Sequence, residues 1–173
     1  MANTYTLISS NILSSNAASV TFSAIPATYT DLVVRFSARA NVASYSANLT
    51  MTLNGSSSAV YSRTDIRADS STATSTRTTS ATSFSIRSLT TGTSESNTFS
   101  TAEIYIPNYL VSANKPLSTV GATEGNTATA GTVYQNIAGA LFSDTTAISS
   151  IALSSSADFV SGSSFYLYGI KKN

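Results

Sequence analysis

Apolar and polar residues alternate with a period of two along most of this chain. In Thr101–Tyr109, Ile104 and Ile106 fall on one side of an extended chain, and polar residues fall on the other. This alternation predicts a strand with one buried face. Pro107 has no backbone N–H to donate to a ladder, so we expect the strand to end there and a turn to begin at Asn108.

The same pattern recurs on both sides of this segment. Residues 31–40 and 48–53 place apolar side chains at every second position, and an Asn54-Gly55 turn follows. Residues 133–142 are apolar on both faces, which predicts a central strand. No segment has a helical period. We therefore predict an all-β fold, a single antiparallel β-sandwich of the jelly-roll kind with about eight to ten strands.

We expect one domain, because 173 residues suit a single core and 42% of them are hydrophobic. Residues 1–30 are predicted to form an N-terminal arm and the first strands, and residues 31–173 the sandwich core.

No apolar run approaches the roughly 20 residues that span a bilayer. The N-terminus has no secretion-signal pattern, so we expect a soluble protein made in a cytoplasm.

Charge and composition exclude several functional classes. Charged residues make up only 10% of the chain and the net charge is +1, so no basic field is present to hold nucleic acid or an anionic membrane. The chain has neither Cys nor His, which removes disulfides, thiolates, the usual zinc ligand and the usual general base. We expect no catalytic residues, no metal and no cofactor.

The remaining acidic residues give a weak case for an enzyme. A glycosidase needs two facing carboxylates, and Glu103 and Glu124 are the best candidates. The favoured interpretation is that these glutamates pair with Arg side chains or face water. Asp144 and Asp158 are isolated and are expected to make side-chain turns instead of binding a metal.

The lysines do not suit Ser/Lys catalysis, which would require a buried amine. Lys115 stands beside a proline in a predicted turn, and Lys171 and Lys172 lie at the end of the chain.

The most charged stretch is 60–69. Arg63, Asp65, Arg67 and Asp69 share one face of a predicted strand with alternating sign, and Ile66 marks the opposite face. One interpretation is a solvated face whose charges partly pair along the strand. Another is a subunit contact, in which the striped face pairs with its copy across a symmetry axis. A catalytic Arg/Asp pair is the third.

Two further groups of residues are candidates for contacts with partners. Ser70–Ser83 is predicted to be a Ser/Thr-rich loop that contains Arg77 and is long enough to reach a partner. Several tyrosines in or near predicted turns offer aromatic faces on which sugar rings stack, although the chain has no Trp. These tyrosines are Tyr29, Tyr45, Tyr109 and Tyr134.

A series of short motifs resembles a group of small tailed-bacteriophage virion proteins. The resemblance covers most of the chain from about Tyr5. Its clearest motifs are Glu103–Tyr109, Asn114-Lys115, Glu124–Asn126, Ala147–Leu153 and Phe165–Lys172. Asp31–Val34, Ser37–Arg39 and the Arg-rich strand Arg63–Asp69 match less closely. The resemblance implies a jelly-roll-like sandwich that commonly assembles as a homotrimer, and it carries no catalytic residues.

The resemblance leaves two virion roles open. A fibre needs a shaft, and the predicted domain begins within about five residues of Met1. We therefore expect a capsid decoration or cement protein on the outer surface of the head, with the major capsid protein as partner. The Arg63–Asp69 stripe is the candidate subunit interface, and the N-terminal arm or the Arg77 loop would contact the shell. The alternative is a tail-fibre or tail-tip module that binds a host glycan, with Tyr45 and Tyr109 as stacking residues.

Overall fold

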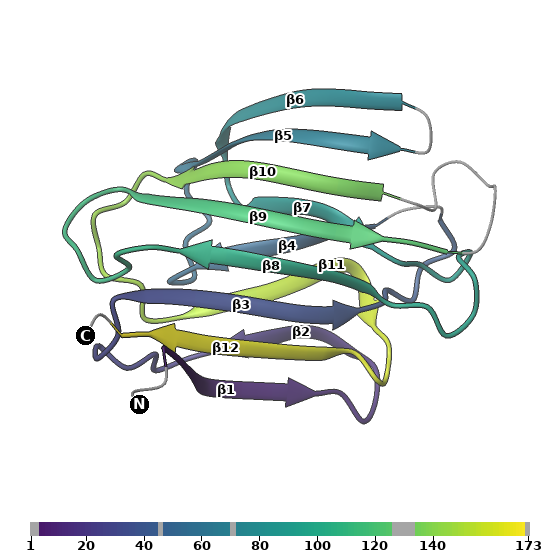
Figure 1. Cartoon of the computed structure of the whole chain (residues 1–173), viewed down its shortest axis with the longest axis horizontal. Coiled ribbons are helices and arrows are strands. Elements are labelled where there is room, and N and C mark those ends of the chain that lie inside the picture. The colour runs from purple at the N-terminus through teal and green to yellow at the C-terminus, as the bar shows by residue number, and fades with distance from the viewer. Residues whose placement is uncertain (1–3, 45–46, 70–71, 126–133, 172–173) are drawn as a thin grey trace.

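The structure is a computed structural model that describes residues 4–44, 47–69, 72–125 and 134–171. No described residue is helical, and the strands form two antiparallel sheets (Figure 1). The predicted all-β sandwich is confirmed, with more strands than expected. The twelve described strands are β1 (Tyr5–Ile12), β2 (Ala17–Phe22), β3 (Asp31–Ala38), β4 (Ala47–Leu53), β5 (Tyr61–Asp69), β6 (Thr72–Ala81), β7 (Phe84–Leu89), β8 (Ser100–Ile106), β9 (Lys115–Thr123), β10 (Tyr134–Phe142), β11 (Ile151–Phe159) and β12 (Ser164–Ile170).

Eight of these strands follow the order of a jelly roll. They pair as β1 with β12, β2 with β11, β3 with β8 and β4 with β7, so that the pairs are nested along the chain. The smaller sheet has the order β2-β11-β4-β7, and the larger sheet begins with β1-β12-β3-β8. The other four strands are two insertions, β5–β6 and β9–β10, which continue the larger sheet as β9-β10-β5-β6.

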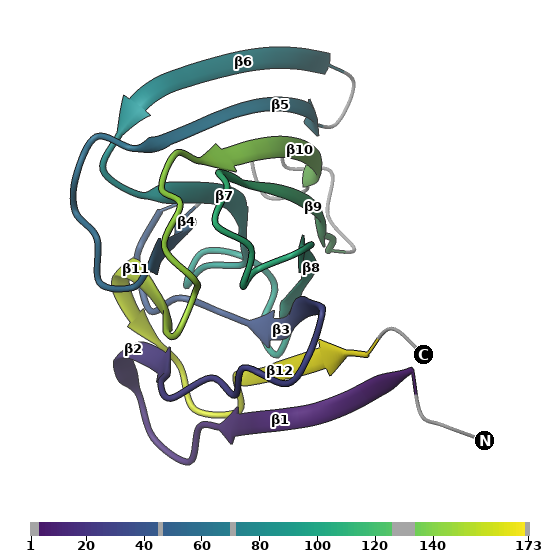
Figure 2. The same ribbon diagram turned by 90° about the vertical axis from the view of Figure 1, so that its left-hand side faces the viewer.

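The insertions leave part of the larger sheet beyond the smaller one. β7 is the edge strand of the smaller sheet and lies against β8, β9, β10 and β5 (Figure 2). β6 is the outermost strand of the larger sheet, and nearly all of its residues are exposed. The insertions therefore add surface to the sandwich more than they add core.

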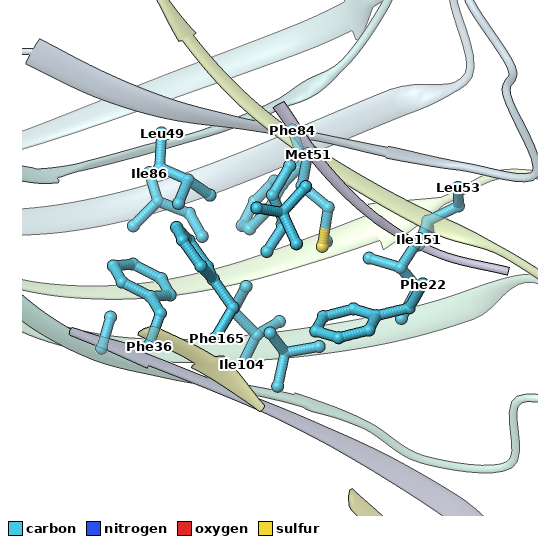
Figure 3. Close-up of a cluster of buried hydrophobic side chains, with 14 of the residues drawn as sticks. Phe22, Phe36, Leu49, Met51, Leu53, Phe84, Ile86, Ile104, Ile151 and Phe165 are labelled. Carbon is cyan, nitrogen blue, oxygen red and sulfur yellow. The ribbon is translucent and has the colours of Figure 1, made fainter. Parts of the chain in front are cut away.

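The core lies between the two sheets and is almost entirely apolar. Inward-facing side chains from both sheets meet there (Figure 3). Phe165 of β12 packs against Phe36 of β3 and Phe159 of β11, with ring centroids 6.0 and 4.9 Å apart. The alternate residues of β3 that were predicted to face inward are all buried: Leu32, Val34, Phe36 and Ala38.

Two predicted turns are confirmed by their backbone conformation. Asn54 and Gly55 follow β4 with φ of 54° and 66°. Asn108 has φ of 50° directly after the strand-ending Pro107. Asn tolerates this left-handed region because its short polar side chain forms local hydrogen bonds, and Gly has no Cβ to clash.

The predicted loop Ser70–Ser83 is wrong, because Thr72–Ala81 forms β6 and pairs with β5. Both faces of β6 are exposed, so the strand has no apolar face to give a period-two signal. Its threonines nevertheless favour an extended chain through their branched Cβ atoms. Within residues 1–30, predicted to be an N-terminal arm and the first strands, β1 and β2 are hydrogen-bonded strands of the two sheets.

Replacing Phe165 by Ala is expected to lower the free energy of unfolding by about 3–5 kcal/mol, because the lost ring leaves a cavity between the sheets. Thr74→Ala on the exposed β6 should change it by less than about 0.5 kcal/mol. Urea denaturation of both variants measures the difference. Equal losses would mean that the stability does not reside in the core between the sheets.

Candidate interaction surface

Tyr61 determines which way the side chains of β5 point. It is buried, and its hydroxyl accepts a hydrogen bond from the backbone N–H of Leu53 at 2.9 Å. Because alternate residues of a strand share a face, Arg63 and Asp65 also turn inward. Arg63 Nε lies 3.4 Å from Asp65 Oδ1, and Arg63 Nη1 donates to the backbone carbonyl of Ser85 on β7. Asp65 is only 2% exposed.

The charged stripe is therefore not a solvated face at Arg63 and Asp65, although its predicted pairing along the strand is present. Arg67 and Asp69 are half-buried on the same side of β5. The Arg67 guanidinium lies 5.7 Å from the centroid of the Tyr134 ring on β10. A subunit contact through this stripe stays a prediction, which charge reversal at Arg67 tests by its effect on the oligomer mass.

The inner face of β5, β10 and β9 is unusually polar for a buried layer. Asn136 of β10 and Thr119 of β9 are nearly fully buried on this face. Side-chain atoms of these residues lack hydrogen-bond partners within the described part of the chain, as do Arg67 Nε and Thr123 Oγ1. Since unpaired buried polar groups cost free energy, this layer contributes less to stability than the apolar core does.

The outer face of the same strands carries an exposed aliphatic row, formed by Ile66, Ile137 and Val120. Their side chains are 61, 64 and 54% exposed. Ile137 of β10 is the direct cross-strand partner of Ile66 on β5 and of Val120 on β9. Direct partners have Cβ atoms about 5 Å apart, so the three side chains form one continuous apolar strip.

An ion pair continues this row across the sheet. Glu103 on β8 is the cross-strand partner of Val120, and Arg35 on β3 is the partner of Glu103. Arg35 Nε donates to Glu103 Oε2 at 2.7 Å, and this bond raises the pKa of the guanidinium. The guanidinium also lies 5.5 and 5.8 Å from the ring centroids of Tyr5 and Tyr168. The two charges of this row, Arg35 and Glu103, thus neutralise each other within the chain.

A hollow of about 450 Å³ lies beside the aliphatic row. It is floored by the next row of outward residues, which we call the small row: Ala68, Gln135, Ala122 and Thr101. Ala68, Ala122 and Thr101 have short side chains, whereas the aliphatic row stands above them. The outer face is therefore ridged, with one row of large and one row of mostly small side chains.

The other candidate contact residues are not brought together. Arg77 is exposed on β6, where its Nη1 donates to Thr64 Oγ1 at 2.9 Å. Tyr109 is fully buried and its hydroxyl donates to the carbonyl of Pro26, so its ring offers no face to a sugar. Tyr45 lies outside the described residues. Tyr29 and Tyr134 are half-buried.

Lys115 differs from its predicted exposed turn. It begins β9 and is buried, and burial lowers the pKa of its amine. Its Nζ donates to the carbonyls of Ala113 and Thr145 at 2.5 and 3.3 Å. These contacts involve only main-chain oxygens, so the lysine joins two loops instead of serving a serine nucleophile.

The two glutamates lie as the favoured interpretation expected, one paired with Arg and the other facing water. Glu103 pairs with Arg35, and Glu124 is exposed. Asp144 Oδ1 accepts from the backbone N–H of Thr146 at 2.7 Å, which confirms the expected side-chain turn. In the described part of the chain, no three acidic side chains gather closely enough to hold a metal ion.

Comparisons with protein-family models, curated proteins and solved structures give no match. The resemblance to phage virion proteins therefore stays a prediction. Within residues 4–44, 47–69, 72–125 and 134–171, no helix is long and apolar enough to cross a membrane.

The sequence interpretation missed Ile66, Ile137 and Val120 as surface residues. The available signal was the apolar character of both faces in 133–142, which predicts a central strand. β10 is indeed central, between β9 and β5, but only one of its faces is covered.

Asp65→Ala is expected to lower the free energy of unfolding by about 3 kcal/mol, because it leaves the Arg63 guanidinium without its carboxylate in a largely dry layer. Asp158→Ala is the matched control, since Asp158 is exposed. Chemical denaturation compares the two variants. A loss at Asp65 no larger than at Asp158 would contradict an internal role for the stripe.

Stability should fall as the pH rises through about 10, where tyrosines of the unfolded chain ionise. Burial raises the pKa of Tyr61, Tyr105 and Tyr109 in the folded chain, so the unfolded state loses protons first and is favoured. Thermal unfolding from pH 8 to 11 should show a shallower decline for Tyr61→Phe than for wild type. Identical slopes would rule out Tyr61 as a contributor.

Proposed function

We propose that this protein is a non-enzymatic structural protein of a phage virion, a decoration or cement protein that binds the outer surface of the assembled head as an oligomer. The observation that carries the proposal is the exposed aliphatic row. An exposed apolar surface of this kind suits a protein whose role is to form stable contacts with other protein subunits.

The row is costly in an isolated chain. Fully burying a Val or Ile side chain is worth about 1.5–3 kcal/mol, and here three of them stand side by side in water. Elsewhere the outward positions of this chain are often Ser or Thr, so polar alternatives were chemically available. Contiguous exposed apolar side chains typically mark contacts with protein or ligand.

The strand order adds support of a general kind. Jelly rolls are common in viral capsid proteins and in lectins, so the order is compatible with a head protein and with a sugar-binding tail protein. The resemblance to small phage virion proteins favours the virion in either case. The low net charge fits contacts made through apolar side chains and hydroxyls.

The mechanism of a cement protein follows from mass action. A protein that binds only the assembled shell lowers the free energy of that shell relative to its separated subunits. The major capsid protein is the expected partner, and the resemblance implies three copies in the bound oligomer. The exposed Arg77 on β6 remains a candidate contact with the shell.

A second candidate is a tail module that binds a host glycan. The observation that favours it is a group of tyrosines on the outer face, at the β1–β12 end of the larger sheet. Tyr166 and Tyr168 have ring centroids 6.4 Å apart and planes 28° apart, and Tyr5 lies edge-on to Tyr168. In this candidate function a sugar ring would stack on these tyrosines, because Tyr109 is buried and cannot contact it.

Purified, labelled protein added to empty heads of the parent phage is expected to bind saturably and to raise the temperature at which the heads break. Host cells are the parallel arm. Binding to cells that disappears after surface glycans are stripped would move the protein to the tail and replace the proposal by the second candidate. Binding to neither would refute both.

A further inference from the structure

We propose that the outer face of β5, β10 and β9 packs against the same face of a second copy of this chain, across a twofold axis. The inference deepens the proposed function, on which it rests for the expectation that the protein assembles. Two trimers joined through this face would satisfy both the pairing and the three copies that the resemblance implies. It is argued from the shape and the charge of the two rows on that face.

The first step is the alternation of large and small side chains. On β5 the aliphatic row has Ile66 and the small row has Ala68, two residues farther along the same strand. On β9 the corresponding residues are Val120 and Ala122. On both strands a large side chain of the aliphatic row thus lies next to a small side chain of the small row. The two rows are separated by the two-residue repeat of a strand.

The second step is that this pattern of large and small side chains is complementary to a second copy of itself. A twofold axis parallel to the rows and midway between them places the aliphatic row of one copy over the small row of the other. Ile66 then lies over Ala68 of the second copy, and Val120 over Ala122 of the second copy. Side chains of two packed sheets interdigitate in this way, and a twofold interface uses one patch on both partners.

The third step is the neutrality of the two rows. The ion pair of Glu103 and Arg35 lies at the end of the aliphatic row and is closed within one chain at 2.7 Å. In the twofold arrangement Glu103 lies over Thr101 of the second copy, so no charge directly opposes its own kind. A neutral partner with an apolar ridge fits this face, and a nucleic acid or a strongly charged protein does not.

One residue does not follow the pattern. Gln135 is the long member of the small row, and it would lie beneath Ile137 of the second copy. Its side chain is exposed and must turn aside when the faces meet. Gln135→Ala is therefore expected to tighten the pairing. If the face bound a different partner, this substitution would not be expected to strengthen self-association.

The experiment is the mass of the full chain in solution by sedimentation equilibrium. Wild type should contain an even number of chains, and the double variant Ile66→Thr/Ile137→Thr should halve that number. The pairing is expected to weaken by at least about tenfold. Threonine keeps the strand propensity, and both side chains are exposed in the single chain, so folding is preserved and circular dichroism checks it.

Two more variants separate this face from the rest of the surface. Ala122→Arg fills the small row and should also halve the mass. Val111→Thr changes an exposed aliphatic residue outside the rows and should leave it unchanged. An odd number of chains, a monomeric wild type or a mass insensitive to both row variants would overturn the pairing.

Head binding is measured separately. A wild type that binds heads as an oligomer with an odd number of chains overturns only the pairing, and a paired wild type that binds no heads overturns only the proposed function.

Discussion

The buried side chain of Tyr61 and its hydrogen bond to the backbone of Leu53 set the orientation of β5, and the character of both faces of this strand depends on it. A shift of one residue in a strand exchanges its two faces. With Tyr61 inside, the charged residues of β5 are drawn toward β7 and Ile66 is left outside. Ile66 thereby joins Ile137 of β10 and Val120 of β9 in the exposed aliphatic row.

The two insertions separate structural and surface roles in the chain. The eight jelly-roll strands enclose the apolar core, and β5–β6 and β9–β10 extend only one sheet. On their inner face these insertions carry a polar layer with unpaired groups, and on their outer face they carry aliphatic side chains in water. Neither arrangement stabilises a single chain in water. Both are compatible with inserted strands that are covered by another protein in an assembly.

The sequence was most informative where one face of a strand is buried, as in β3, because alternation then records burial directly. It failed at β6, where both faces are wet and Ser/Thr content resembles that of a loop. A solvated face was one of the three interpretations of Arg63 and Asp65, since charge is usually outside, and no local signal reveals that Tyr61 turns this side of the strand inward. Lys115 was misplaced for the same reason: its carbonyl partners come from 113 and from 144–145, which only the fold brings together.

The nesting of the strand pairs has a consequence for synthesis on the ribosome. β12 lies between β1 and β3 in the larger sheet, and its residues are translated after those of every other strand. Until then β1 has no neighbour and β3 has one open edge, and such edges attract other chains. The larger sheet can therefore be completed only after β12 has been synthesised, and until then these edges are open to pairing with other chains.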